Sequence, residues 1–310
     1  SDPTTAGSIG QLYFNSAGNV FKYVATGTVG AWASGGALPA ARMGAATSGG
    51  VQSAGWVAMG FTGSAYLKSS LEYDGSSWAG AADLNRGTGT SGNGIGPQTA
   101  GIAAGGTTAP PASAIATTEL YNGTSWANSG DMSATLNDST IGGSSAAATT
   151  AGGKVGGTAA TTSFLFDGST WSTNPASLAT ARNQAGANNG TSTAMLVIGG
   201  EIPPSAYTVN VEEYNGSAWT EVGNTNTGRA RAGAAGVGGS TALYFGGQAP
   251  TTAKTEYFDG TTWTEVADLS AINYTPYGSG LANDALSVGG TPNGSTALTT
   301  TEEWTIPDIV

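Results

Sequence analysis

The sequence contains no cysteine and no histidine. Without cysteine the chain has neither disulfide bonds nor thiolate chemistry. Without histidine it lacks the commonest general base and the commonest protein ligand of transition metals. We therefore expect no metal and no cofactor, and we expect a protein that is not an enzyme.

Charged residues are also scarce, at 9% of the chain, and nine Lys and Arg stand against twenty Asp and Glu, for a net charge of −11. Binding to nucleic acid or to an anionic membrane surface needs clustered Lys and Arg, so neither partner is expected. No apolar run is long enough to cross a bilayer, and no signal peptide is visible. The chain starts at Ser1 without an initiator Met, which is typical of a processed form or of a fragment of a longer protein.

What the sequence has in abundance is glycine, with 51 residues, together with eight Trp, eleven Tyr and seven Phe. A disordered chain of such composition would be poor in aromatic residues. Here the aromatic residues recur at regular intervals, which indicates many short strands joined by tight turns.

The recurring unit is an aromatic residue, Asp-Gly or Asn-Gly, two small residues and Trp. The five copies are Tyr73–Trp78, Tyr121–Trp126, Phe166–Trp171, Tyr214–Trp219 and Phe258–Trp263. The spacings between successive Trp residues are 48, 45, 48 and 44, which fits a four-stranded propeller blade of about 40–50 residues. Asp-Gly and Asn-Gly favour a type I′ turn with positive φ at both central residues, so each copy is predicted to join the third and fourth strands of a blade.

Two further markers keep the same register. A short apolar strand ending in Gly-Gly precedes each turn, as in Met195–Gly200 and Leu243–Gly247, with a weaker form at Met59-Gly60. A Leu-x-x-x-Arg segment or its relic begins each unit, as in Leu38–Arg42. In two repeats Asn137 and Asn273 replace the Arg.

Together these markers resemble the Kelch repeat over about residues 31–305. The resemblance implies an all-β, Kelch-like β-propeller. We expect five complete repeats and a sixth that begins near Asn273 and lacks its fourth strand, which the strand around Trp32 would supply. Six blades are therefore favoured, with residues 1–29 as an N-terminal hairpin or attachment segment and residues 30–310 as the propeller. A seven-bladed ring that uses Leu12–Tyr23 is the alternative.

No catalytic constellation is evident. Sialidases are propellers with an arginine triad, and the candidates here are Arg42, Arg86, Arg182, Arg229 and Arg231. Their repeat-equivalent places favour a structural role, in which they bind backbone carbonyls between blades. The same argument applies to a carboxylate beside the third-strand aromatic, at Glu72, Glu119, Glu213, Glu256 and Glu303. A polysaccharide-degrading enzyme that uses carboxylates alone is the least favoured hypothesis.

Function is more readily attached to the loops between second and third strands, which vary most between repeats. By propeller geometry these loops share a face with the fourth-to-first connections. Tyr66 and Tyr207 are candidate platforms on which sugar rings stack, with Arg42 and Arg182 as candidate hydrogen-bond donors to the ligand.

The Ala-, Gly- and Thr-rich texture resembles proteins of bacteriophages that infect aquatic bacteria, and Gly10–Asn15 resembles attachment segments of phage tail and fibre proteins. This resemblance implies a virion-surface protein, located outside the cell. The favoured function is a non-enzymatic receptor-binding or tail-fibre propeller, which recognises a host surface glycan or protein. The alternative is a structural virion protein that decorates or links other subunits through residues 1–29. Whether the chain forms a homo-oligomer is left open.

Overall fold

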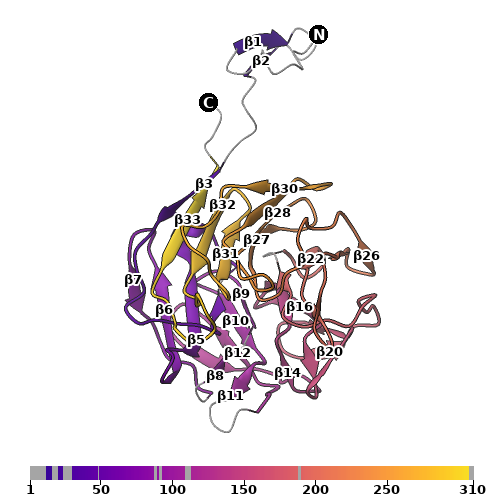
Figure 1. Ribbon diagram of the computed structural model, residues 1–310. Helices are drawn as coiled ribbons and strands as arrows, with labels where there is room; N and C mark the ends of the chain where they lie inside the picture. The colour runs from indigo at the N-terminus through magenta and orange to yellow at the C-terminus, as the bar shows by residue number, and fades with distance from the viewer. Residues whose placement is uncertain are drawn as a thin grey trace.

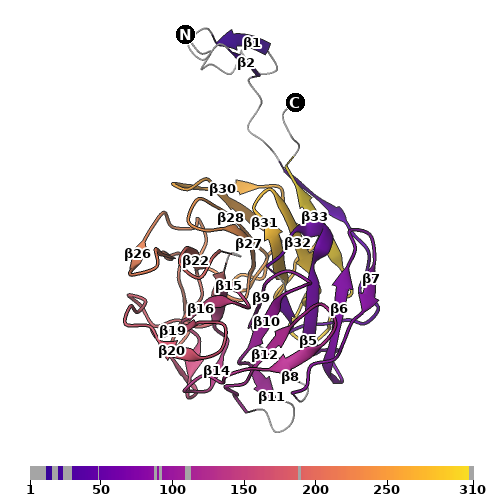
Figure 2. The same cartoon turned by 180° about the vertical axis from the view of Figure 1, so that it is seen from behind.

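The structure is a computed structural model that describes residues 12–15, 20–23, 30–47, 49–86, 89–90, 93–108, 113–187 and 190–306. Within these ranges the chain forms six four-stranded antiparallel sheets. The sheets follow one another around a ring in chain order, as the colours show from both sides of the molecule (Figures 1 and 2). The predicted six-bladed β-propeller is therefore the observed architecture.

Each of the first five blades takes its strands from one repeat, and the strands of each blade are given with the innermost first. Blade 1 is β4 (Ala46–Thr47), β5 (Trp56–Phe61), β6 (Tyr66–Tyr73) and β7 (Trp78–Gly80). Blade 2 is β9 (Asn93–Ile95), β10 (Gly101–Ala104), β12 (Thr118–Tyr121) and β13 (Trp126–Asn128). Blade 3 is β15 (Thr140–Ser144), β16 (Ala147–Ala151), β19 (Ser163–Phe166) and β20 (Trp171–Thr173).

The second half of the ring repeats the pattern. Blade 4 is β21 (Gly186–Ala187), β22 (Met195–Ile198), β25 (Val211–Tyr214) and β26 (Trp219–Glu221). Blade 5 is β27 (Gly233–Val237), β28 (Thr241–Phe245), β29 (Thr255–Phe258) and β30 (Trp263–Val266). Blade 6 is β31 (Tyr277–Leu281), β32 (Asp284–Val288), β33 (Thr301–Thr305) and β3 (Ala31–Ser34).

Several short strands and one 3-10 turn lie in the connections between these strands. They are β8 (Gly89–Thr90), β11 (Thr107–Thr108), β14 (Leu136–Asn137), β17 (Lys154–Val155), β18 (Thr158–Ala159), β23 (Glu201–Ile202), β24 (Ala206–Tyr207) and the 3-10 turn η2 (Gln52–Ala54). Over the described residues, no helix is both long and apolar enough to cross a membrane.

The first and last parts of the propeller meet in blade 6. Strand β3 pairs with β33, with Trp32 opposite Trp304, and Trp304 is fully buried. The predicted closure by the N-terminal strand is therefore correct, and it leaves β33 with a partner on each side. β1 (Leu12–Asn15) and β2 (Val20–Tyr23) pair with each other as a hairpin and contribute no seventh blade. The role of residues 1–29 in attachment stays a prediction.

The hydrophobic core lies between neighbouring blades. The aromatic residue before each turn contacts the Trp after it, as in Tyr121 and Trp126, whose ring centroids are 4.9 Å apart. These rings pack against the adjacent blade, where Trp56 meets Trp126 edge to face at 5.4 Å. Burial of such large aromatic surfaces supplies the main favourable energy of the ring.

The turns differ from the predicted type I′ geometry. In all five copies only the Gly has a positive φ, as at Gly75 with φ 89°. Asp74 is the first residue of its turn, and its Oδ1 accepts the N–H groups of Ser76 at 2.9 Å and Ser77 at 2.7 Å. The short side chain thus satisfies the turn's backbone and needs no positive φ of its own. Asp74, Asp167 and Asp259 are turn residues, as predicted.

The Gly-Gly marker has the predicted role near the axis. A Cβ on Gly105 would lie 2.3 Å from the carbonyl oxygen of Leu136, and the neighbouring Gly106 N–H donates to that oxygen. The equivalent bond in other blades goes to Arg42, Arg182, Arg229 or Asn273. In blade 3 the residue that stands in place of the Arg is therefore Leu136. The sequence had predicted Asn137, one residue later.

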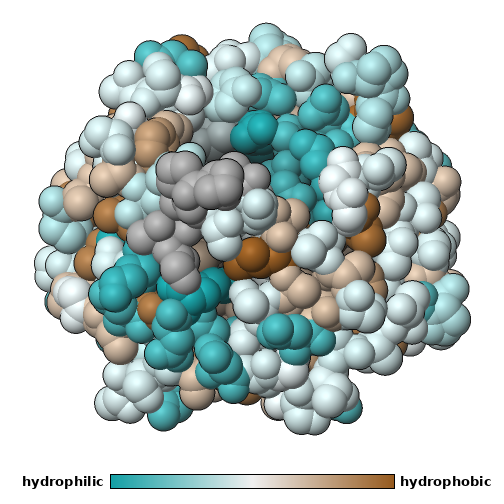
Figure 3. Space-filling view, turned by 90° about the horizontal axis from the view of Figure 1, so that it is seen from below, coloured by the Kyte–Doolittle hydropathy of each residue, from teal (hydrophilic) through white to brown (hydrophobic). Residues whose placement is uncertain are grey.

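The outer surface is polar with scattered apolar residues. Figure 3 shows one side of the molecule, where hydrophilic and weakly polar residues surround isolated hydrophobic ones. Of the large hydrophobic residues in the described ranges, Val51, Val237 and Ile272 are exposed, and they lie in different blades or connections. Such single residues are ordinary on a protein surface and indicate no docking patch.

Candidate functional site

A cavity of about 350 Å³ lies where the innermost strands of the six blades converge. Every blade contributes lining residues from its first strand or from the few residues before it, including Thr47, Asn93, Asp138, Gln184, Arg231 and Tyr277. Residues at the connections between second and third strands of two blades also line it, among them Tyr66, the first residue of β6, and Gly294. The two kinds of connection therefore share one face, as the repeat geometry predicted. The volume is in the range that binds a small ligand.

Three lining residues occupy equivalent positions in consecutive blades. Asp138, Gln184 and Arg231 each lie two residues after the repeat position held by Leu136, Arg182 and Arg229. All three have left-handed backbone conformations, with φ of 54°, 56° and 57°. Such conformations cost free energy in residues other than Gly and concentrate at functional sites.

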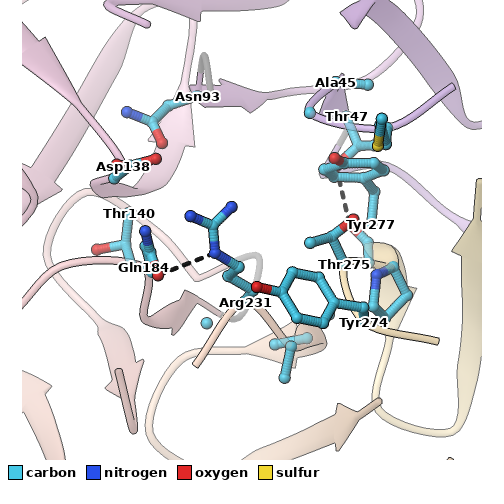
Figure 4. A pocket seen from close by; sticks show the side chains of 18 of the residues that line it. Ala45, Thr47, Asn93, Asp138, Thr140, Gln184, Arg231, Tyr274, Thr275 and Tyr277 are labelled. Carbon is cyan, nitrogen blue, oxygen red and sulfur yellow. Dashed lines mark hydrogen bonds between the residues drawn. The ribbon is translucent and has the colours of Figure 1, made fainter. Parts of the chain in front are cut away.

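The backbones of these residues form a chain across two blade boundaries. The Gln184 N–H donates to Asp138 O and the Arg231 N–H donates to Gln184 O, both at 2.7 Å. The unusual backbone places one polar side chain from each of three blades on the cavity wall (Figure 4).

Arg231 is held by its neighbours on both sides. Its Nε–H donates to Gln184 Oε1 at 2.9 Å, and its guanidinium carbon lies 5.8 Å from the ring centroid of Tyr274. The two terminal nitrogens extend into the cavity (Figure 4), and over the described residues they form no hydrogen bond or ion pair. Asp138 is different, because its Oδ2 contacts Lys154 Nζ at 3.3 Å and Asn137 Nδ2 at 3.4 Å.

Much of the remaining wall is aromatic. Tyr274 and Tyr277 come from blade 6, while Phe61 and Tyr66 come from blade 1 with ring centroids 4.6 Å apart. Burial raises the pKa of Tyr277 to about 12, so its hydroxyl is neutral at physiological pH. The cavity therefore offers charged groups, amides, hydroxyls and aromatic rings within one small volume.

The two tyrosines predicted to bind ligand fall in different places. Tyr66 lines the cavity, whereas Tyr207 lies on β24 outside the lining, where its hydroxyl accepts a hydrogen bond from Gln248 Nε2 at 3.3 Å. Tyr66 therefore lines the same cavity as Asp138, Gln184 and Arg231. Tyr207 instead contacts Gln248 outside that cavity.

Arg42 and Arg182 are buried in the blade junctions and do not line the cavity. They are 2% and 1% exposed. Arg42 NH1 donates to Met59 O and Ser69 O, and Arg182 donates to Gly199 O, Asn210 O and Glu212. Burial is also the main cause of the lowered pKa of both guanidinium groups. This geometry matches the structural role considered for the repeat arginines and leaves neither side chain accessible to a ligand.

The third-strand carboxylates occupy two structural positions. Glu119, Glu212, Glu256 and Glu302 are buried and accept N–H groups of the preceding connections. Glu72 and Glu303 accept the hydroxyls of Tyr121 and Tyr73 from the next blade. Across the described ranges no three acidic side chains gather as a metal site would require.

Sequence reasoning missed Asp138 and Gln184 and grouped Arg231 with the structural arginines. That grouping was wrong, because the repeat position in blade 5 is Arg229 and Arg231 lies two residues beyond it. A signal was present in the sequence. The residue two places after the repeat position changes from blade to blade, through Gly44, Asp138, Gln184, Arg231 and Thr275, while the residues around it keep their pattern.

Comparison with known proteins bears on the fold. No family model and no curated protein matches the chain. Among solved structures, one titled "Structure of YjhT", of a Kelch-repeat propeller protein, is similar with a TM-score of 0.72. The match covers 88% of this chain and 97% of that one, at 14% sequence identity. The fold is that of a Kelch-like β-propeller. At this identity the similarity concerns the fold alone, and the function has to be argued from the cavity.

Proposed function

We propose that this Kelch-like propeller binds a saccharide in its central cavity, without a chemical step. The observation that carries the proposal is the composition of the cavity wall. Asp138, Gln184 and Arg231 lie on the side formed by blades 3 to 5, and the aromatic residues lie on the side formed by blades 6 and 1.

A sugar matches such a wall because it combines many hydroxyl groups with apolar ring faces. Each hydroxyl can donate and accept hydrogen bonds, which suits a cavity with a guanidinium, amides, a carboxylate and neutral hydroxyls. The C–H face of the ring packs against aromatic side chains, for which Tyr66 is the predicted platform. The absence of histidine and cysteine from the sequence favours binding over catalysis.

The biological setting remains the one inferred from the sequence texture. We propose a virion-surface protein of a bacteriophage, whose propeller recognises a host surface glycan. Residues 1–29 would attach it to other virion proteins, and the self-contained β1–β2 pairing supports a separate role for this segment. A structural virion protein without a sugar ligand is the alternative proposal.

The test is binding of the labelled, purified protein to a panel of aquatic bacterial cells and to their extracted polysaccharides. The same samples are assayed for new reducing ends. Saturable binding without cleavage is expected, whereas cleavage would establish an enzyme. If no cell or polysaccharide is bound, the structural alternative stands.

Two tyrosine variants locate the site. Tyr66→Ala removes a ring from the cavity wall and should weaken binding about tenfold or more, as expected when a stacked aromatic contact is lost. Tyr207→Ala removes a ring of the same size outside the cavity and serves as the matched control. If Tyr207→Ala alone abolishes binding, the ligand occupies the outer loops and the cavity proposal is wrong.

A further inference from the structure

We propose that the cavity selects anionic saccharides, and that Arg231 is the group that binds the anion. The inference rests on the proposed function and adds the class of ligand. It follows from the way in which the charges of the cavity wall are paired.

Two formally charged side chains, Asp138 and Arg231, are among the lining residues. The carboxylate of Asp138 has a cation beside it, because Lys154 Nζ lies 3.3 Å from Oδ2. Arg231 forms no ion pair in the described ranges, and the short gaps between them from residue 48 to residue 189 contain no Asp or Glu. The uncompensated charge inside the cavity is therefore positive, although the chain as a whole carries −11.

A neighbouring arginine shows what a structural guanidinium looks like in this fold. Arg229 is fully buried, its NH1 donates to Gly246 O and Lys254 O, and its NH2 donates to Glu256 Oε1. Arg231 lies two residues away and uses only Nε, toward Gln184 Oε1. Its terminal N–H groups are thus available to a ligand, whereas those of Arg229 are already bonded.

The contact with Gln184 also orients the guanidinium. Anchoring Nε turns the two terminal nitrogens toward the cavity (Figure 4), in the fork that matches two oxygens of a carboxylate or sulfate. Because the backbones of the two residues are bonded as well, the fork is positioned before a ligand arrives. Gln184 is therefore a positioning residue, and Arg231 contacts the anion.

The experiment measures the affinity of the full chain for three probes by calorimetry: trigalacturonate, the neutral galactotriose, and galactose 6-sulfate. Arg231→Gln removes the charge and the fork, and Arg231→Lys keeps the charge alone. Lys68→Gln is the control, since it removes an equal charge from an exposed pair with Asp83 outside the cavity. Thermal unfolding of each variant confirms that it is folded.

We expect the parent protein and Lys68→Gln to bind trigalacturonate or the sulfated sugar more tightly than galactotriose. The preferred anion then identifies carboxylate or sulfate as the recognised group. Arg231→Gln should weaken anion binding about tenfold or more and change galactotriose binding by less than about threefold. The anion affinity of Arg231→Lys should lie between those of the parent and Arg231→Gln. Equal affinities for charged and neutral sugars, unchanged in Arg231→Gln, would overturn the inference and keep the proposed function. Failure of all three probes to bind, together with failure in the polysaccharide panel, would overturn both.

Discussion

Arg231 and Gln184 come from adjacent blades and are joined twice, by a backbone hydrogen bond of 2.7 Å and by a side-chain hydrogen bond of 2.9 Å. The direction of the guanidinium in the cavity is therefore fixed by how blades 4 and 5 pack. The residues just before the innermost strands can in this way bring side chains from different repeats together in the cavity.

The first prediction tests this pair. Gln184→Glu keeps an acceptor for the Arg231 Nε–H and adds a negative charge beside the guanidinium. The new carboxylate would compete with an anionic ligand for the same cation. We expect the affinity for trigalacturonate to fall about tenfold or more and the affinity for galactotriose to stay within about threefold, both measured by calorimetry.

Gln248→Glu is the matched control for this variant. It makes the same change of charge at a residue that contacts Tyr207 outside the cavity. Equal losses in the two variants would mean that the added charge acts through the overall field of the protein, and the specific role of Gln184 would be rejected.

The second prediction concerns ring closure. Removal of residues 1–34 deletes β3 and with it Trp32, whose ring lies 4.8 Å from Phe245 and whose Nε1–H donates to Thr255 Oγ1 at 3.0 Å. The truncation also leaves β33 as an exposed edge that can pair with other chains. We expect a clear fall in melting temperature and concentration-dependent association in sedimentation measurements.

Removal of residues 1–29 alone is the comparison, because it retains β3. This shorter truncation should keep the melting temperature of the parent. If both truncations melt alike, the pairing of β3 with β33 contributes little and the closure has no energetic role.

Much of this fold was predictable because the repeat signals are local. The turn needs Gly at one position, the Gly-Gly step needs positive φ where a Cβ would meet the next blade, and the Trp needs an aromatic partner across the hairpin. Each requirement acts within a few residues and recurs in several blades, so a departure such as Met59, with φ 60°, does not hide the pattern. The predicted turn type was wrong because the Asp74 side chain accepts the N–H groups of Ser76 and Ser77, and this turn needs a positive φ only at Gly75.

The cavity was harder to predict for the opposite reason. Asp138, Gln184 and Arg231 differ in chemistry, and they become neighbours only when three blades are assembled. Nothing near Gln184 in the sequence indicates a contact with Arg231, 47 residues away. Tyr66 and Tyr207 were both candidates because their loops depart from the repeat. The structure places Tyr66 in the cavity wall and Tyr207 outside it, so this criterion does not by itself identify cavity residues.

The third prediction is a pH dependence that arises at the blade junctions. Burial, aided by hydrogen bonds to Glu303 and Glu72, raises the pKa of Tyr73 and of Tyr121 to about 12, compared with about 10 in an unfolded chain. Between pH 10 and 12 the unfolded state loses these protons first, so the native state binds more protons and stability falls as the pH rises. Below pH 10 the contribution is fully present.

The double variant Tyr73→Phe/Tyr121→Phe should therefore be less stable than the parent at pH 8, by about 1–3 kcal/mol per lost hydrogen bond to a charged group. The difference should narrow toward pH 12. Urea unfolding at each pH measures both quantities. A difference that stays constant from pH 8 to 12 would contradict the assignment of these pKa values to the two hydroxyls.

The last prediction separates two arginines that lie two residues apart. Arg229 forms a fully buried ion pair with Glu256 at 2.7 Å and lies 4.5 Å from the ring centroid of Tyr244. Arg229→Met leaves the Glu256 carboxylate buried without its cation, which should cost about 3–5 kcal/mol in urea unfolding. Arg231→Gln removes a charge that has no ion-pair partner in the described ranges, and should change the free energy of unfolding by less than about 1 kcal/mol.

Replacing Glu256 together with Arg229 should recover part of the loss, because no lone buried charge remains. If Arg231→Gln were the more destabilising of the two, Arg231 would belong with the structural arginines, and the proposal that it binds an anion in the cavity would be wrong.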